Sequence, residues 1–272
     1  MKDELINRPD YSKFPKLFHK DNNATITYLK RFSFINFFIL FQQELPLSQE
    51  TFYLCLNLFD RYIEKTRSEK KKNLDLNLIA LTCIFIAAKY EEIYPPKLKN
   101  FLYIFRNSYI KRDIYLKEEE ILSKLNFDIL TISPYLFLSK FCFYDNFSYT
   151  ESKYDKELCF QCAQFLLELF LIEPLFCQMK PSLQAATCIY LSRKLLKYDK
   201  RMNNVWNNEL TYITSYDEVN IKENIEIALK VLKNFFGNYY TKNFSSMAIY
   251  TKFSTLAHLE VSVKIKETIF GE

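Results

Sequence analysis

The sequence predicts an all-α protein built from two successive bundles of five helices each. Glycine is scarce: the 272 residues contain only Gly237 and Gly271, which argues against hairpin-rich folds that need glycine in their turns. Apolar residues recur with helical rather than alternating spacing along most of the chain. Two similar segments also begin 105 residues apart, at residues 78 and 183. Such a spacing suits two copies of one small domain.

The first block predicts five helices separated by turn signals. Pro46 precedes Ser48, a good N-cap residue, the run RSEKKK occupies 67–72, and Pro95 and Pro96 form a rigid stop. The helices are expected near 27–43, 48–65, 75–90, 97–106 and 113–126.

The second block begins after TISP (131–134) and repeats this order. Its helices are expected near 135–144, 151–172, 181–198, 204–212 and 218–236, and residues 237–272 form a mixed tail. The predicted divisions are an N-terminal segment (1–26), a first domain (27–130), a second domain (131–236) and the tail (237–272).

The internal similarity joins LIALTCIFIAAK (78–89) to LQAATCIYLSRK (183–194) without a gap. Both segments are apolar and rich in alanine, which lets neighbouring backbones approach closely. We interpret each as the central, buried helix of its bundle. The alternative is a chance similarity between two apolar helices.

Several classes of function find little support in the composition. Gly-rich phosphate loops and dinucleotide fingerprints are excluded from residues 1–236, which contain no glycine. The odd number of cysteines, seven, suits reduced thiols, and the CxxC pair Cys159 and Cys162 falls inside a predicted helix with no second CxxC. Only His19 and His258 could supply histidine chemistry. We therefore expect no enzyme, no metal and no cofactor.

No signal peptide and no stretch able to span a bilayer is recognised in the sequence. We therefore expect a soluble protein of the nucleus and/or cytoplasm without a membrane partner.

Four motifs carry a family resemblance. They are KYEEIYPP (89–96) after a small-residue helix, TFYLCLNLFDRYIEK (51–65), EEEILSKLNFDI (118–129) and, in the tail, YTKFSTLAHLEVS (250–262). Their order and content resemble the cyclin family, in particular the A- and B-type cyclins of the cell cycle. The resemblance implies two cyclin boxes of five helices each, preceded by a short N-terminal helix.

The resemblance also implies a function. Cyclins bind the small lobe of a cyclin-dependent Ser/Thr kinase and press on its C-helix, which sets the catalytic lysine–glutamate pair. The two residues that grip the kinase in the family match Lys89 and Glu118. The surrounding contact positions match Ile86, Tyr90, Glu119, Leu122, Phe127 and Ile129. The plain structural alternatives are that Lys89 complements its helix dipole, that Glu118 is solvated, and that Ile86 and Leu122 are core residues.

The first helix contains LKRFSFINFF (29–38), which resembles a further family motif. This match implies an ion pair between Arg31 and Asp60. It also implies a substrate-docking patch, which for this chain would comprise Lys30, Phe34, Phe37, Leu76 and Asn77. The patch departs from the family at Lys30 and Phe37, and Leu40 replaces an acidic residue. We therefore expect weaker attraction for basic Arg-x-Leu motifs of substrates or inhibitors.

Two rival classes share the tandem fold. A transcription-type cyclin is one, and a DNA-binding protein like transcription initiation factor IIB is the other. The net charge of +5 permits DNA binding, but the charge gathers in loop-like runs such as KKK (70–72), and no Arg-rich recognition helix stands out. Nucleic acid is therefore an unlikely partner on sequence grounds.

Overall fold

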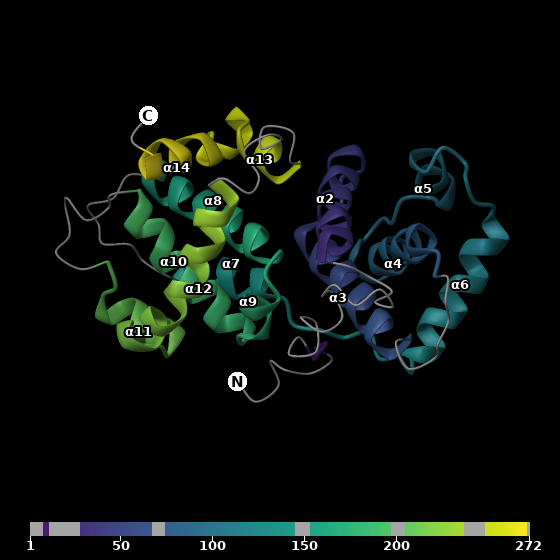
Figure 1. Ribbon diagram of the computed structural model, residues 1–272, viewed down its shortest axis with the longest axis horizontal. Coiled ribbons are helices and arrows are strands. Elements are labelled where there is room, and N and C mark those ends of the chain that lie inside the picture. The colour runs from purple at the N-terminus through teal and green to yellow at the C-terminus, as the bar shows by residue number, and fades with distance from the viewer. Residues whose placement is uncertain are drawn as a thin grey trace. The chain divides into compact units, whose positions relative to one another are not determined.

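The fold is all-helical, as predicted. Figure 1 shows a computed structural model that describes residues 8–10, 28–66, 74–144, 153–196, 205–236 and 248–270, and no strand occurs in these ranges. The chain divides into two compact units, residues 1–133 and 134–272. The expected N-terminal helix belongs to residues 1–26, of which all but residues 8–10 lie outside the described part.

The described part of the first unit contains five helices, each within a few residues of its predicted range. They are α2 (Tyr28–Glu44), α3 (Gln49–Thr66), α4 (Leu76–Glu91), α5 (Leu98–Ile104) and α6 (Lys111–Lys124). The central helix is α4, which contacts α3, α5 and α6. Its residues from Ile79 to Ala88 are all buried. Because Ala80, Ala87 and Ala88 have small side chains, these neighbours can pack closely against it.

Local signals set the ends of these helices. The side chain of Asp75 accepts a hydrogen bond of 3.1 Å from the amide of Leu78 and so caps the start of α4. The helix α5 ends at Ile104, earlier than predicted, because Arg106 and Asn107 adopt left-handed backbone angles with φ of 52° and 53°. A left-handed residue after the last turn is a common helix stop.

The second unit is also built around one central helix, α10. Its described helices are α7 (Pro134–Tyr144), α8 (Lys153–Phe170), α9 (Pro174–Gln178), α10 (Pro181–Leu195), α11 (Asn208–Thr214) and α12 (Glu218–Phe236). The helix α10 contacts α7, α8 and α12, as expected for the second copy of the repeated segment. The predicted helix over 151–172 corresponds to α8 within two residues at each end, whereas the short helix α9, which begins at Pro174, was not predicted.

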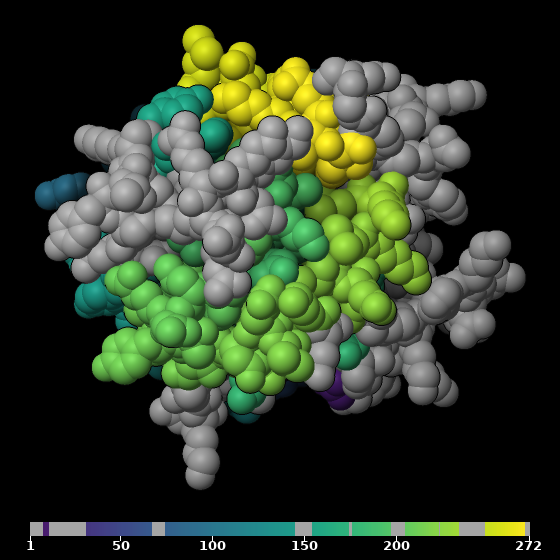
Figure 2. All heavy atoms as spheres, turned by 90° about the vertical axis from the view of Figure 1, so that its left-hand side faces the viewer, coloured from purple at the N-terminus to yellow at the C-terminus, as the bar shows by residue number. Residues whose placement is uncertain are grey.

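The tail is helical over residues 248–270 and belongs to the second unit. It contains α13 (Ala248–Phe253), a 3-10 turn (Leu256–His258) and α14 (Val261–Phe270), and both α13 and α14 contact α8. Figure 2 shows these yellow residues lying directly against green side chains of the same unit. Phe253, Val261 and Ile265 are fully buried, so the tail supplies part of the core of this unit.

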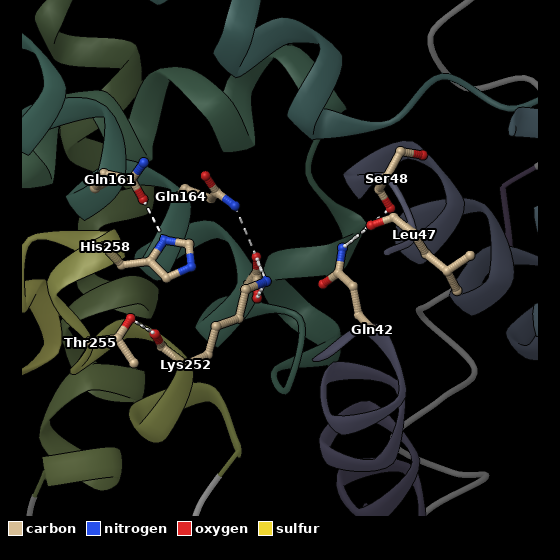
Figure 3. A network of polar contacts seen from close by, with 9 residues as sticks. Gln42, Leu47, Ser48, Gln161, Gln164, Lys252, Thr255 and His258 are labelled. Atoms are coloured by element: carbon tan, nitrogen blue, oxygen red, sulfur yellow. Dashed lines mark hydrogen bonds and ion pairs between the residues drawn. The ribbon is translucent and has the colours of Figure 1, made fainter. Parts of the chain in front are cut away.

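Polar contacts also join the tail to α8. Lys252, only 8% exposed, forms an ion pair of 2.7 Å with the fully buried Glu168. His258 Nδ1 lies 2.8 Å from the side-chain oxygen of Gln161, and Figure 3 shows both Lys252 and His258 pointing toward α8. Burial of a charged pair is tolerated because each partner neutralises the other.

The cysteines of the CxxC pair lie inside α8 with no exposed surface. Burial raises the pKa of the Cys162 thiol, and the nearby Cys159 and Cys188 add to the shift. All seven cysteines are free. Within the described ranges no group of His, Cys, Asp and Glu side chains is arranged to hold a metal ion. No helix in those ranges is long and apolar enough to cross a membrane.

Candidate functional site

The end of α4 and the middle of α6 bring together Lys89 and Glu118, the two residues predicted to bind a kinase. The ammonium of Lys89 forms an ion pair with the carboxylate of Glu118, and the two side chains are 42% and 13% exposed. The Lys89 ammonium also lies 4.5 Å from the centroid of the Phe85 ring, within cation–π range. The cation is therefore held from two directions while part of it stays open to a partner.

The position of Glu118 follows from the pattern of α6. Residues 114, 118, 121 and 125 fall on one helix face, and the other three members of this face, Ile114, Ile121 and Leu125, are at most 1% exposed. Glu118 is therefore the one acidic member of an otherwise apolar face. A carboxylate in such a place needs a partner, and Lys89 supplies it. The neighbouring Glu119, in contrast, is exposed.

The predicted contact residues divide into exposed and buried groups. Tyr90 and Phe127 are 50% and 67% exposed, and Leu122 and Ile129 are half-buried. Phe127 points outward because Asn126 and Phe127 adopt left-handed φ angles of 55° and 57°, which turn the chain sharply at the end of α6. Ile86 is only 3% exposed, so the structure places it in the core and not on the contact surface, because α4 turns that face toward its neighbours.

The second glutamate of KYEE has a structural task that the sequence analysis missed. Glu92 accepts hydrogen bonds from the Ser48 amide at 2.7 Å and from the Thr51 hydroxyl at 2.5 Å, at the start of α3. A carboxylate at a helix N-terminus satisfies free amides and complements the helix dipole. Figure 3 shows that Gln42 donates to the carbonyls of Leu47 and Ser48 in the same turn. The segment that follows Lys89 is thereby tied to α3.

The first glutamate of the motif, Glu91, is exposed. Its pKa is raised by partial burial and by the nearby carboxylates of Glu50 and Glu92. Ser48 and Thr51 have the spacing of a typical N-cap turn, which is the local sequence signal at this place. That spacing does not show that Glu92 is the distant side chain that binds them.

The predicted docking patch forms a surface hollow of about 450 Å³ on the first unit. It is lined by Ser33, Phe34, Phe37, Leu74, Asp75, Leu76 and Asn77. Four of the five predicted residues are among them. Lys30 lies in the first turn of α2, and its side chain lies outside the described part.

Asp75 adds an acidic side chain that the sequence analysis did not assign to this hollow. It accepts hydrogen bonds from the Tyr109 hydroxyl at 2.9 Å and 3.1 Å. Burial, followed by this hydrogen bond, raises the pKa of Tyr109 to about 12. The carboxylate is exposed, so the hollow keeps a negative charge beside its aromatic wall.

Arg31 of α2 and Asp60 of α3 form the expected ion pair. The guanidinium reaches both carboxylate oxygens, with Nε to Oδ1 at 3.2 Å and Nη2 to Oδ2 at 2.9 Å. Both side chains are 1% exposed. A two-point contact of this kind fixes how the two helices pack.

Both halves of the chain match known protein domains. Residues 3–130 match the cyclin N-terminal domain and residues 132–266 match the cyclin C-terminal domain. Cyclin-A2-1 of Arabidopsis thaliana is 30% identical over 92% of this chain and 52% of its own length. The G2/mitotic-specific cyclin cdc13 of Schizosaccharomyces pombe is 26% identical over 98% of this chain and 50% of its own length. The chain thus spans about half the length of the curated relatives it matches.

Solved structures agree on the fold. A viral cyclin from herpesvirus saimiri aligns with a TM-score of 0.64 and 17% identity, covering 85% of this chain and 93% of that chain. The CAK complex of Chaetomium thermophilum bound to ATP-gamma-S contains a chain that aligns with a TM-score of 0.60 and 14% identity, covering 89% and 72%. A DNA-binding protein of the factor IIB type is not favoured by the matches to cyclin domains and to A-type and mitotic cyclins. With the cyclin N-terminal and C-terminal domains matched in the two halves and a 30% identical cyclin among its relatives, the chain belongs to the cyclin family.

Proposed function

We propose that this chain is the regulatory subunit of a heterodimer in which it binds and activates a cyclin-dependent Ser/Thr kinase, in control of the cell cycle. The observation that carries the proposal is the Lys89–Glu118 pair, partly exposed at the junction of α4 and α6. An adjacent cation and anion can bind backbone carbonyls and amides of a partner at one point while each restrains the other. The chain itself contributes no catalysis in this proposal.

The surroundings of the pair support a protein contact. Tyr90 and Phe127 are large side chains with at least half of their surface exposed, and aromatic anchors beside a charged pair are typical of binding hot spots. Leu122 and Ile129 supply smaller apolar contacts, and Glu119 adds charge at the edge. In the proposed mechanism this surface presses on the kinase C-helix, which sets the kinase's own lysine–glutamate pair.

The proposal is tested with the variant Lys89→Ala/Glu118→Ala. Cyclin-dependent kinases captured by the wild-type chain from a cell extract are identified by mass spectrometry, and the affinity and phosphorylation rate of the purified kinase are then measured. We expect loss of activation with an unchanged circular dichroism spectrum. The matched control is Glu226→Ala/Lys230→Ala, which removes the same charges from exposed positions of α12 in the second unit. Equal kinase activation by both double variants would contradict the proposal.

A second proposal concerns substrates or inhibitors. The hollow lined by Phe34 and Phe37 has aromatic walls and the exposed carboxylate of Asp75 beside them, which suits a short segment with one cation and one apolar side chain. We expect an Arg-x-Leu peptide to bind there and the variant Asp75→Asn to weaken binding. The measurement is fluorescence anisotropy of a labelled peptide, and equal affinity for wild type and variant would oppose the assignment.

We further propose that the protein acts in the nucleus and/or cytoplasm, where cyclin-dependent kinases meet their substrates. A transcription-type role within the family is the alternative, and the kinase identified by capture distinguishes the two. Imaging of a tagged full-length protein tests the location.

A further inference from the structure

A second set of contacts on α6 fixes this helix against α3. Tyr62 of α3 is fully buried, and its hydroxyl donates a hydrogen bond of 2.8 Å to Glu120 Oε1. Glu120 Oε2 in turn accepts from the Lys117 ammonium at 2.6 Å. Lys65, one turn further along α3, donates to the carbonyl of Lys124 at the end of α6 at 2.9 Å. The two helices are therefore joined at two points by directional bonds.

The arrangement gives α6 two inward faces with different chemistry. Ile114, Ile121 and Leu125 form the apolar face that also carries Glu118. Residues 117, 120 and 124 form a charged face over Tyr62, and the ammonium groups of Lys117 and Lys124 each lie 6.0 Å from the centroid of its ring. Close packing of the apolar face limits rotation of α6, and the hydrogen bond from Tyr62, which weakens steeply with angle, restrains the rotation further. The charged face thus adds a directional restraint to the packing.

Rotation of α6 matters because Glu118 and Glu120 belong to the same helix, so a rotation about its axis moves both side chains. A rotation of about 20° about the axis of α6, at a side-chain radius of about 5 Å, would move the Glu118 side chain by roughly 2 Å. Such a shift is large enough to separate the carboxylate from Lys89.

We propose that Glu120, through its hydrogen bond to Tyr62, is a positioning residue that holds α6 in the rotation at which Glu118 meets Lys89. This inference rests on the proposed function, in which that pair grips the kinase. Glu120 itself does not touch the kinase in this account. It acts through the orientation of its helix.

The test measures affinity for the purified kinase that the wild-type chain captures. We expect Glu120→Leu and Tyr62→Phe each to weaken binding about tenfold. In a Glu118→Gln background, Glu120→Leu should cost less than about twofold, because the interaction that it positions is already gone. The matched control, Glu226→Gln on an exposed turn of α12, should leave the affinity unchanged. Unchanged affinity of Glu120→Leu, or equal losses in both backgrounds, would overturn the inference.

A second measurement does not depend on a kinase. Hydrogen exchange of peptides that cover residues 111–124 should be at least about twofold faster in Glu120→Leu than in wild type and unchanged in the control. Should Glu120→Leu fail to fold, the apolar pair Tyr62→Phe/Glu120→Leu, which does not leave the buried Tyr62 hydroxyl without its acceptor, takes its place in both assays. Unchanged exchange in α6 would overturn the positioning role. If the wild-type chain binds no kinase, the proposed function fails. The exchange rates would still test whether Glu120 holds the orientation of α6.

Discussion

Breaking the ion pair between Arg31 and Asp60 should destabilise the first unit strongly. The variant Asp60→Leu removes the carboxylate and leaves the guanidinium of Arg31 in the core, where its side chain is 1% exposed. Removing one partner of a buried ion pair costs about 3–5 kcal/mol, because the remaining charge keeps its desolvation cost after losing its ion-pair partner. That is a large part of the ~5–15 kcal/mol that stabilises a typical domain.

The expected change is a fall in the urea midpoint of the first unit by about 2 M, for a cost of about 4 kcal/mol and an m-value of about 2 kcal/mol/M. Far-UV circular dichroism follows unfolding of the helices. Fluorescence of the single tryptophan of the chain, Trp206, reports the second unit, where it is 4% exposed. It should keep its wild-type midpoint.

The matched variant is Arg31→Met/Asp60→Leu, which replaces both charges by apolar side chains of similar size. It should recover most or all of the lost stability, because no charge then stays buried without a partner. If Asp60→Leu lies within about 1 kcal/mol of wild type, or if the double variant is as unstable as the single one, the physical account of this pair is wrong.

Three further predictions concern other contacts. Glu92→Ala should lower the free energy of unfolding by about 1 kcal/mol, because the start of α3 loses a capping carboxylate; an unchanged thermal midpoint would count against this cap. Burial lowers the pKa of His258 from its ordinary value of 6.5, and Lys252 adds to this shift, while Glu168 and Glu157 oppose it. As the pH falls, the unfolded chain therefore binds a proton at His258 before the folded chain does. The contribution of His258 to the free energy of unfolding is then fully present above pH 6.5 and is lost as the pH drops below it. The urea midpoints at about pH 7.5 and 5.5 should differ less in His258→Gln than in wild type. Lys252→Ala should leave Glu168 buried without its ion-pair partner and lower the free energy of unfolding by about 3–5 kcal/mol. Hydrogen exchange in residues 248–270 should become faster. Unaltered exchange there would refute the role of this pair in holding the tail.

The sequence predicted the order and type of the helices well because the signals are local. Hydrophobic periodicity, Ser48 as an N-cap and the two prolines after Tyr94 each act within a turn or two of the chain. The repeated segment indicated α4 and α10 as the central helices for the same reason. A helix end that depends on backbone angles, such as the stop of α5 at Ile104, was placed less accurately.

Residues that work across the fold could not be assigned in this way. Glu92 caps a helix whose start lies 44 residues earlier, and Glu120 meets Tyr62 across 58 residues. The periodicity of α4 left open whether Ile86 faces a partner or the core, since a helix that is apolar all round does not reveal which face is covered. The tail was predicted only to be mixed in structure. Its helices belong to the second unit because Phe253 is buried and α13 contacts α8. Sequence patterns record the preferences of short segments, and only the packed structure decides which distant side chains meet, because contacts between segments depend on how each helix is rotated against its neighbours.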